Sequence, residues 1–104
     1  MDLRRYHETL RLLREDYAPL LPVRVARRRM PPLLYGLAEL WDGPTGEPYF
    51  RVSISDRLPG WFLPHALIHE WAHCLSWTNA RTMCDHDPEW AVAYGRLYQE
   101  VIDR

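Results

Sequence analysis

The chain has 104 residues, of which 47% are hydrophobic and 26% are charged. A chain of this length makes one domain around one core, and this composition is typical of a folded globular protein. No run approaches the about 20 apolar residues of a membrane-spanning helix, and the first ten residues lack the apolar stretch of a secretory signal. We therefore expect a single domain over residues 1–104, located in the cytoplasm and with no membrane partner.

Cysteine content and charge distribution add two weaker expectations. Cys74 and Cys84 are too few for the disulfide framework of a small secreted domain, and we interpret them as structural residues while leaving a bridge between them open. Residues 1–30 hold eight Arg against four acids, a balance of +4, and residues 31–104 hold five Arg against ten acids, a balance of −5. The basic part could face nucleic acid or an acidic partner, but a solvated helix and strand explain it equally well.

An amphipathic helix is predicted at the start, because apolar residues recur there at the three-and-four spacing of one helical face: Leu3, Tyr6, Leu10, Leu13 and Tyr17. It should end near Pro19 and Pro22, since proline cannot donate the backbone hydrogen bond of a continuing helix. Three extended segments are then predicted over Val23–Arg28, Leu34–Trp41 and Tyr49–Ser55.

The second and third segments are predicted to form a hairpin, because residues 42–48 between them are dense in turn formers. In the third segment, Phe50, Val52 and Ile54 alternate with polar residues, which is the period of a strand with one buried face. If this strand lies at a sheet edge beside the active site, it could bind an extended peptide by backbone pairing.

Two helices should follow the strands. The first is predicted over Pro64–Trp77, and a loop over Thr78–His86 leads to the second. That second helix has a clear start, because Asp87 can cap it and Pro88 suits its first position. Its inward residues recur at helical spacing: Trp90, Tyr94, Leu97 and Val101. The order of helix, three strands, helix and helix predicts an α+β fold with an antiparallel or mixed sheet.

The motif that carries chemistry is His69-Glu70-Trp71-Ala72-His73. Residues four apart lie one turn apart on the same helix face, so His69 and His73 can direct imidazole nitrogens at one metal ion. A catalytic zinc site takes three protein ligands and keeps a fourth position for water. Glu70 follows the first histidine and could accept a proton from that water. The motif therefore predicts two ligands of one Zn²⁺ ion and a catalytic base.

The alternative interpretation is a buried helix with two satisfied core histidines. Glu70 argues against it, because a carboxylate is rarely fully buried without a partner. If Ile68, Trp71 and Leu75 form the core-facing stripe, the two histidines point elsewhere together. His65 lies one turn earlier, but Ala66 follows it where a base would be needed. We therefore interpret His65 as a flanking or supporting residue.

A third ligand must come from beyond the helix, and the candidates just after the loop are Asp85, His86, Asp87 and Glu89. His86 is preferred, because it is the only other imidazole downstream and a helix returning antiparallel would bring it toward the metal. Glu89 is the second choice. Cys74 is predicted to face away, since it lies about 100° around the helix from His73.

These features resemble the SprT-like zinc metallopeptidases, whose eukaryotic relative is the DNA-dependent protease Spartan. The similarity covers residues 23–98: strands, the His69, Glu70 and His73 motif, then His86 followed closely by the aromatic Trp90. It implies a minimal zincin-like domain with zinc held by His69, His73 and His86, and with Glu70 as the catalytic residue. The family often has Gly where this chain has Asp87, and the zinc ribbon of some relatives is absent, so dependence on DNA is not carried over.

The sequence therefore predicts a metallopeptidase that acts on a peptide or protein substrate, with Glu70 passing a proton from water to the leaving amine. Tyr94 or an arginine is only a guess for the group that stabilises the oxyanion. The alternative function is a non-catalytic, zinc-stabilised module that binds a protein partner or nucleic acid. Its contacts would come from a basic cluster: Arg24, Arg27, Arg28 and Arg29.

Overall fold

The computed structural model describes residues 3–77 and 86–103 and has the predicted α+β architecture. Its elements follow the predicted order: α1 (Arg4–Asp16), β1 (Val23–Arg28), β2 (Gly36–Asp42), β3 (Pro48–Ser55), α2 (Leu63–Leu75) and α3 (Pro88–Leu97). A short 3-10 turn, Gly60–Phe62, precedes α2, and a π-helical turn, Tyr98–Ile102, extends α3. The predicted bounds of the strands and of α2 differ from these by at most two residues.

The three strands form a mixed sheet in the order β1-β3-β2. β2 and β3 are the predicted antiparallel hairpin, while β1 pairs with β3 in parallel. The third strand therefore does not meet the condition for peptide pairing, a place at the sheet edge, because β3 is the central strand. The reason is burial: Phe50, Val52 and Ile54 need shielding on both sides, whereas Leu40 and Trp41 of β2 remain partly exposed.

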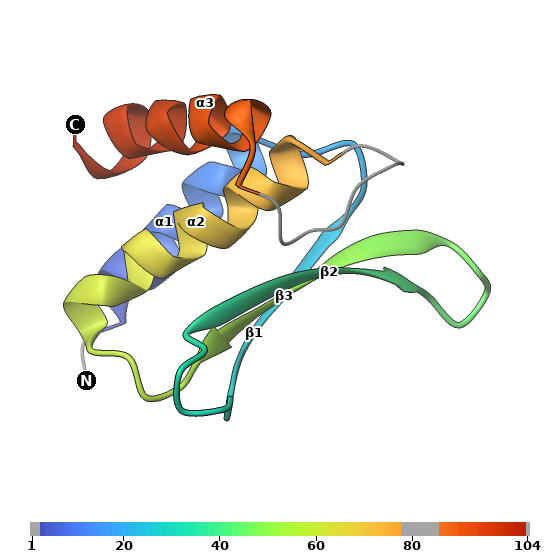
Figure 1. Cartoon of the computed structure of the whole chain (residues 1–104), viewed down its shortest axis with the longest axis horizontal. Helices are drawn as coiled ribbons and strands as arrows, with labels where there is room; N and C mark the ends of the chain where they lie inside the picture. Colours follow the sequence, from blue (N-terminus) through green and yellow to red (C-terminus); the bar gives the residue numbers. More distant parts are fainter. Residues whose placement is uncertain (1–2, 78–85, 104) are drawn as a thin grey trace.

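The described helices all cover one face of the sheet (Figure 1). That face carries the apolar residues of β3, which join the buried residues of α2 in one core. None of the described helices is long and apolar enough to cross a bilayer. The helix-covered face thus contributes the core, and the opposite face is left without a covering layer in the described part of the chain.

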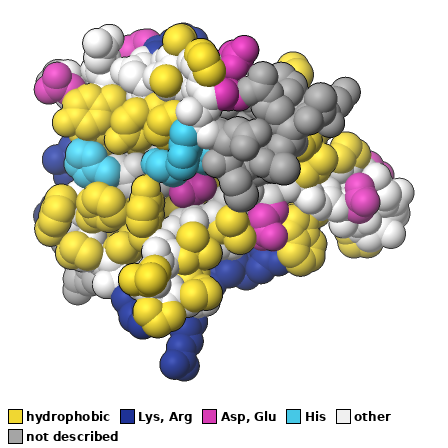
Figure 2. Space-filling view, viewed as in Figure 1, with side chains coloured by type: hydrophobic (Ala, Val, Ile, Leu, Met, Phe, Trp, Pro, Cys, Tyr) yellow, Lys and Arg dark blue, Asp and Glu magenta, His cyan; other side chains and the backbone are white. Residues whose placement is uncertain are grey.

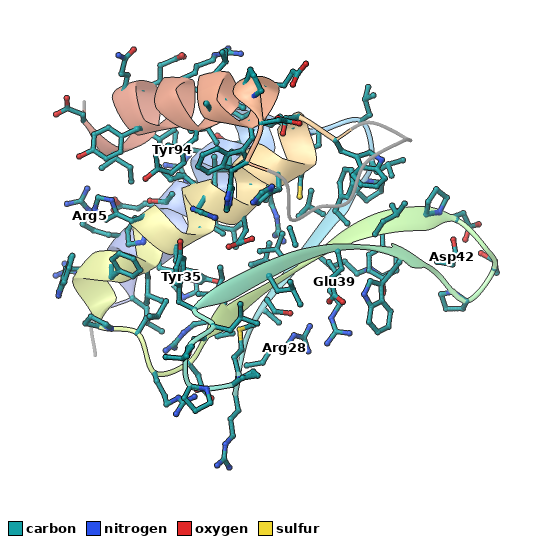
Figure 3. All side chains as sticks on the ribbon, viewed as in Figure 1. Arg5, Arg28, Tyr35, Glu39, Asp42 and Tyr94 are labelled. Carbon is teal, nitrogen blue, oxygen red and sulfur yellow. The ribbon has the colours of Figure 1, made fainter. Side chains whose placement is uncertain are left out.

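The outer face of the sheet carries polar and aromatic side chains, and Arg28 and Glu39 point away from the helices there (Figure 3). The guanidinium of Arg24 lies 4.3 Å from the ring centre of Tyr49, and Arg28 donates to the Ser53 hydroxyl. Arg27 belongs to the other face, because it lies opposite the buried Ile54 in the register and donates to the Asp56 carbonyl. The predicted basic cluster is therefore divided between the two faces, since successive strand residues alternate in direction.

α2 is the central helix, with its apolar residues enclosed by the sheet on one side and by α1 and α3 on others. Trp71 is only 1% exposed, and its indole N–H donates to the backbone carbonyl of Tyr17 at 2.9 Å. The Tyr17 hydroxyl in turn donates to the Glu100 carboxylate at 2.9 Å. The end of α1 is thereby joined both to α2 and to the C-terminal turn.

Replacing Trp71 with Phe should lower the free energy of unfolding by about 2 kcal/mol, because it removes the hydrogen bond to Tyr17 and leaves unfilled volume in the core. The matched control is Trp61→Phe, since Trp61 is 73% exposed and should tolerate the change within about 0.5 kcal/mol. Urea denaturation followed by circular dichroism measures both. Equal losses in the two variants would contradict the anchoring role of Trp71.

Candidate metal centre

Two histidines of α2 share a face that the core does not use. His69 and His73 lie one turn apart with ring centres separated by 5.4 Å, while Ile68 and Trp71 face the core as predicted. His73 is buried and His69 is half-buried. The helical spacing thus brings both imidazoles to one place, as the sequence predicted.

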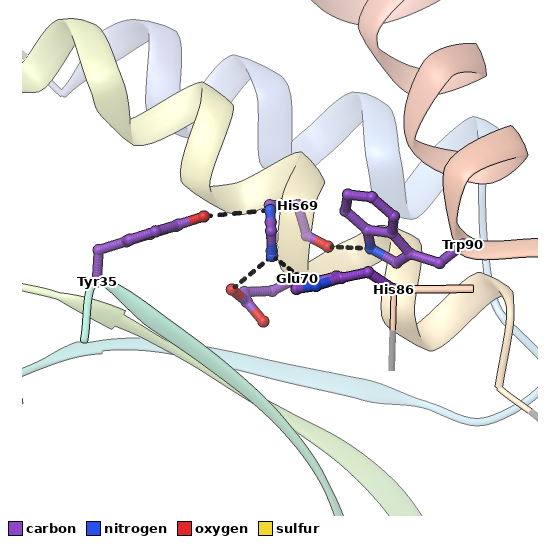
Figure 4. A network of polar contacts seen from close by, with 5 residues as sticks. All are labelled: Tyr35, His69, Glu70, His86 and Trp90. Atoms are coloured by element: carbon purple, nitrogen blue, oxygen red, sulfur yellow. Dashed lines mark hydrogen bonds and ion pairs between the residues drawn. The ribbon is translucent and has the colours of Figure 1, made fainter. Parts of the chain in front are cut away.

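His86 reaches the same place from the start of α3. The Asp87 carboxylate caps this helix by accepting a hydrogen bond from the Trp90 backbone N–H at 2.9 Å, which fixes where the helix begins. The Nε2 atoms of His86 and His69 are 3.1 Å apart (Figure 4). One ring nitrogen from each of His69, His73 and His86 lies within 4.8 Å of the others. The predicted convergence of three imidazoles is therefore confirmed.

The other candidates for a third ligand are not part of this group. Asp87 serves as the helix cap, and Asp85 lies outside the described residues. Glu89 lines a separate hollow of about 640 Å³ between the end of α2 and α3, beside Trp77 and Arg96. In residues 3–77 and 86–103, the three histidines are the only group found with the side chains to hold a metal ion.

The donor set suits a divalent metal ion. Burial, with a further contribution from the neighbouring His86, lowers the pKa of His69 to about 4, so this imidazole is neutral at physiological pH, as a metal ligand must be. Two nitrogens held at 2.0–2.1 Å from a tetrahedral ion would be about 3.3 Å apart, close to the 3.1 Å between His69 and His86. Imidazole ligands suit zinc, copper, iron and nickel. The three histidines could thus hold one such ion.

Glu70 lies beside this cluster with a carboxylate that is almost fully buried. The residue is 4% exposed, and one carboxylate oxygen is 3.9 Å from Nε2 of His69. Burial raises the pKa of Glu70 to about 8. A Cβ atom added to Gly36 would lie 2.7 Å from the Glu70 Oε2 atom and 3.0 Å from its Cγ. Glycine at the start of β2 therefore provides the space that the carboxylate occupies.

Two further groups hold His69 in place, Tyr35 and Trp90. Tyr35 belongs to no motif that the sequence analysis recognised. The Tyr35 hydroxyl is 3.2 Å from Nδ1 of His69, and the Trp90 indole N–H donates to the His69 carbonyl at 3.2 Å (Figure 4). A hydrogen bond at Nδ1 orients the ring so that Nε2 faces His86, which is the usual support for a metal-binding histidine. Tyr35 precedes β2, so only the tertiary structure brings it here.

Trp90 and Tyr94 lie on the inward side of α3, as predicted, but they pack at the edge of the core and not in its buried centre. Leu97 and Val101 are buried as expected, but Trp90 and Tyr94 are only partly buried. Their rings stack on each other with centres 5.0 Å apart, and Trp90 lies 4.5 Å from the His86 ring. The first turns of α3 thus contact both the histidine cluster and the edge of the core, whereas Leu97 and Val101 reach its buried centre.

His65 and Cys74 take no part in the cluster. The His65 ring stacks on Phe62 with centres 6.0 Å apart, so it flanks the site as an aromatic neighbour. Cys74 is a buried free thiol, and burial raises its pKa, which makes it unreactive. This agrees with a structural role for Cys74, while Cys84 lies outside the described residues.

The cluster opens into a pocket of about 250 Å³. One wall consists of residues 34–38 at the start of β2, and the other contains Glu70 and the three histidines. A small molecule or a peptide group entering this pocket would therefore meet the imidazoles and the carboxylate together.

Comparisons of the chain with protein families, curated proteins and solved structures found no match. The resemblance to SprT-like peptidases accordingly stays a prediction. The interpretation of the site depends on its geometry and chemistry.

The metal-free protein should lose stability as the pH rises from 6.5 to 8. Because the pKa of Glu70 rises from 4.5 to about 8 on folding, the folded state keeps a proton that the unfolded state releases, and the free energy of unfolding falls across this window. The lowered pKa of His69 acts in the opposite direction, but only between about 4 and 6.5. The expected loss above pH 6.5 is about 1.5 to 2 kcal/mol, measured by urea denaturation in the presence of a chelator.

The variant Glu70→Gln should remove this pH dependence, because glutamine does not titrate. Glu15→Gln is the matched control, since Glu15 is exposed on α1 and should leave the slope unchanged. An equal slope in the original chain and in Glu70→Gln would contradict the assignment of the effect to Glu70.

Proposed function

We propose that this chain is a SprT-like zinc metallopeptidase in which His69, His73 and His86 hold the ion and Glu70 is the catalytic base. One observation carries the proposal: a buried carboxylate lies beside three converging imidazoles at the wall of an open pocket. A purely structural metal site has no need of an acid next to its ligands. Zinc is the ion we propose, because with three protein ligands it keeps a position open for chemistry.

When bound, zinc would supply a Lewis acid that polarises a carbonyl and makes water more acidic. The chain's own contribution is the position of Glu70. Its carboxylate borders the pocket, where it can accept a proton from the attacking water and later donate it to the leaving amine. Tyr35 orients His69 through Nδ1. No group is assigned to the oxyanion.

An extended peptide could bind along β2. This strand takes the role that the sequence analysis assigned to Phe50–Ser55, because β2 pairs only with β3 among the described strands and its first residues line the pocket. Backbone hydrogen bonds to its open edge would orient a substrate without regard to its side chains. This mode of binding favours peptides or unfolded segments over compact proteins.

The direct test is zinc content and peptide hydrolysis in two variants. Glu70→Gln should keep one equivalent of zinc and lose about 10²- to 10⁴-fold in kcat/KM, because it removes the proton acceptor and leaves the ligands. His86→Ala should lose the zinc itself, as measured by metal analysis of the purified protein.

A different result would favour the non-catalytic alternative. A zinc-loaded chain that cleaves no peptide, but binds nucleic acid in a salt-sensitive way unaffected by Glu70→Gln, would replace the peptidase proposal with a zinc-stabilised binding module.

Gly36→Ala should lower kcat/KM by about 100-fold without loss of zinc. The three atoms nearest to the added methyl group all belong to Glu70, so the change would displace the carboxylate, and a shift of about 1 Å in a catalytic group can have an effect of this size. Gly95→Ala is the matched control, because a Cβ at Gly95 meets nothing within 4 Å. Full activity in Gly36→Ala would mean that Glu70 need not occupy its present position.

A further inference from the structure

Exposed aromatic side chains border the histidines on two sides. In the space-filling view, hydrophobic side chains form one band above and one band below the histidines (Figure 2). Ring contacts define two bands there: the turn band, which consists of Tyr35 and of Trp61 and Phe62 of the 3-10 turn, and the α3 band, which consists of Trp90, Tyr94 and Tyr98. His65 and His69 each contact rings of both bands.

The turn band is a continuous set of ring contacts that leads to the metal centre. The Tyr35 ring lies 5.5 Å from Phe62 and 5.5 Å from His69, and Trp61 lies 5.5 Å from Phe62. Phe62 stacks on His65. Tyr35 also lines the pocket at the start of β2, so this band is continuous with the proposed active site.

The α3 band closes the other side. The ring of Tyr98 lies 5.9 Å from His65, and that of Tyr94 lies 6.0 Å from His69. Tyr94 and Tyr98 are themselves in contact with ring centres 6.4 Å apart. The two bands therefore flank one strip of surface, which contains His65 and His69 of α2 and leads to the metal centre.

Core packing does not account for three of these rings, because they remain exposed. Trp61 is 73% exposed, Tyr98 is 39% exposed and Tyr35 is 36% exposed. Large apolar side chains gathered at the surface mark a binding site more often than scattered ones do. Aromatic walls beside a few polar groups are also the usual lining of a site for an apolar group.

We propose that the two bands form a specificity site for a large apolar or aromatic side chain of a peptide substrate, next to the bond that is cut. This inference rests on the proposed function. The occupant is a peptide because Tyr35, which borders this strip of surface, also lines the pocket beside β2, where an extended chain can pair with the strand edge. Tyr35 directly precedes β2, so the bands adjoin one end of this strand and serve one side of the cleavage site only.

The first experiment uses the zinc-loaded full chain and a set of quenched fluorescent peptides. Each of the three positions on either side of the bond is varied among Phe, Leu, Ala and Asp. We expect Phe and Leu to exceed Ala and Asp by about 10- to 100-fold in kcat/KM at a position on one side, the range that filling an apolar pocket provides. A flat profile, or an equal preference on both sides, would overturn the proposal.

Variants then connect this preference to the bands. Trp61→Ala and Tyr98→Ala should each reduce the ratio of Phe to Asp peptides at least fivefold, mainly through KM. Val92→Ala is the matched control, because Val92 is 74% exposed on α3 but belongs to neither band, and it should leave the ratio unchanged. A preference that survives both band variants would place the specificity site elsewhere.

Failure of the peptidase proposal would be seen separately, as the absence of cleavage for every peptide. The surface between the two bands is then tested by calorimetric binding of the same peptides to zinc-loaded Glu70→Gln protein. At least tenfold tighter binding of the Phe peptide than of the Asp peptide, lost in Trp61→Ala, supports the site. Equal binding, or a Trp61-dependent affinity for phosphatidylcholine vesicles instead, overturns it.

Discussion

The whole site depends on keeping the Glu70 carboxylate inside the protein beside three imidazoles. A buried acid is costly to ionise, which is why its pKa rises, and it is tolerated only where its surroundings compensate. Two features make this position possible. The missing side chain of Gly36 gives it room, and His69 provides a polar neighbour. A bound cation would supply the remaining compensation, so the metal-free protein retains an electrostatic cost that metal binding removes.

The fold holds the Glu70 carboxylate in this buried position by enclosing α2. The sheet and the flanking helices cover its apolar residues, and the Trp71 hydrogen bond to Tyr17 fixes α2 against the end of α1. Only one stripe of the helix remains available, and it carries the histidines. α3 then begins at a defined residue, because Asp87 caps it, and this places His86 opposite His69. A small domain thus brings its three histidines together through the packing of α2 and the defined start of α3.

With the proposed function, the surroundings of the cluster would combine two kinds of recognition. The open edge of β2 offers backbone hydrogen bonds, which are indifferent to sequence, and the aromatic bands offer apolar contact, which selects side chains. Tyr35 belongs to both, since it borders the pocket and supports His69. The residue that orients a proposed ligand therefore also lines the surface that a substrate would meet.

The sequence by itself determined what depends on local geometry. Helical spacing placed His69 and His73 on one face, alternation identified the strands, and the capping pair before α3 marked its start. Only the tertiary structure decided how distant segments meet. It made β3 the central strand instead of an edge strand. It also placed Gly36 beside the Glu70 carboxylate and the Tyr35 hydroxyl beside the His69 ring. Periodicity shows which face of an element is buried, but it contains no information about the neighbour that covers that face, because that choice is made by the packing of the whole chain.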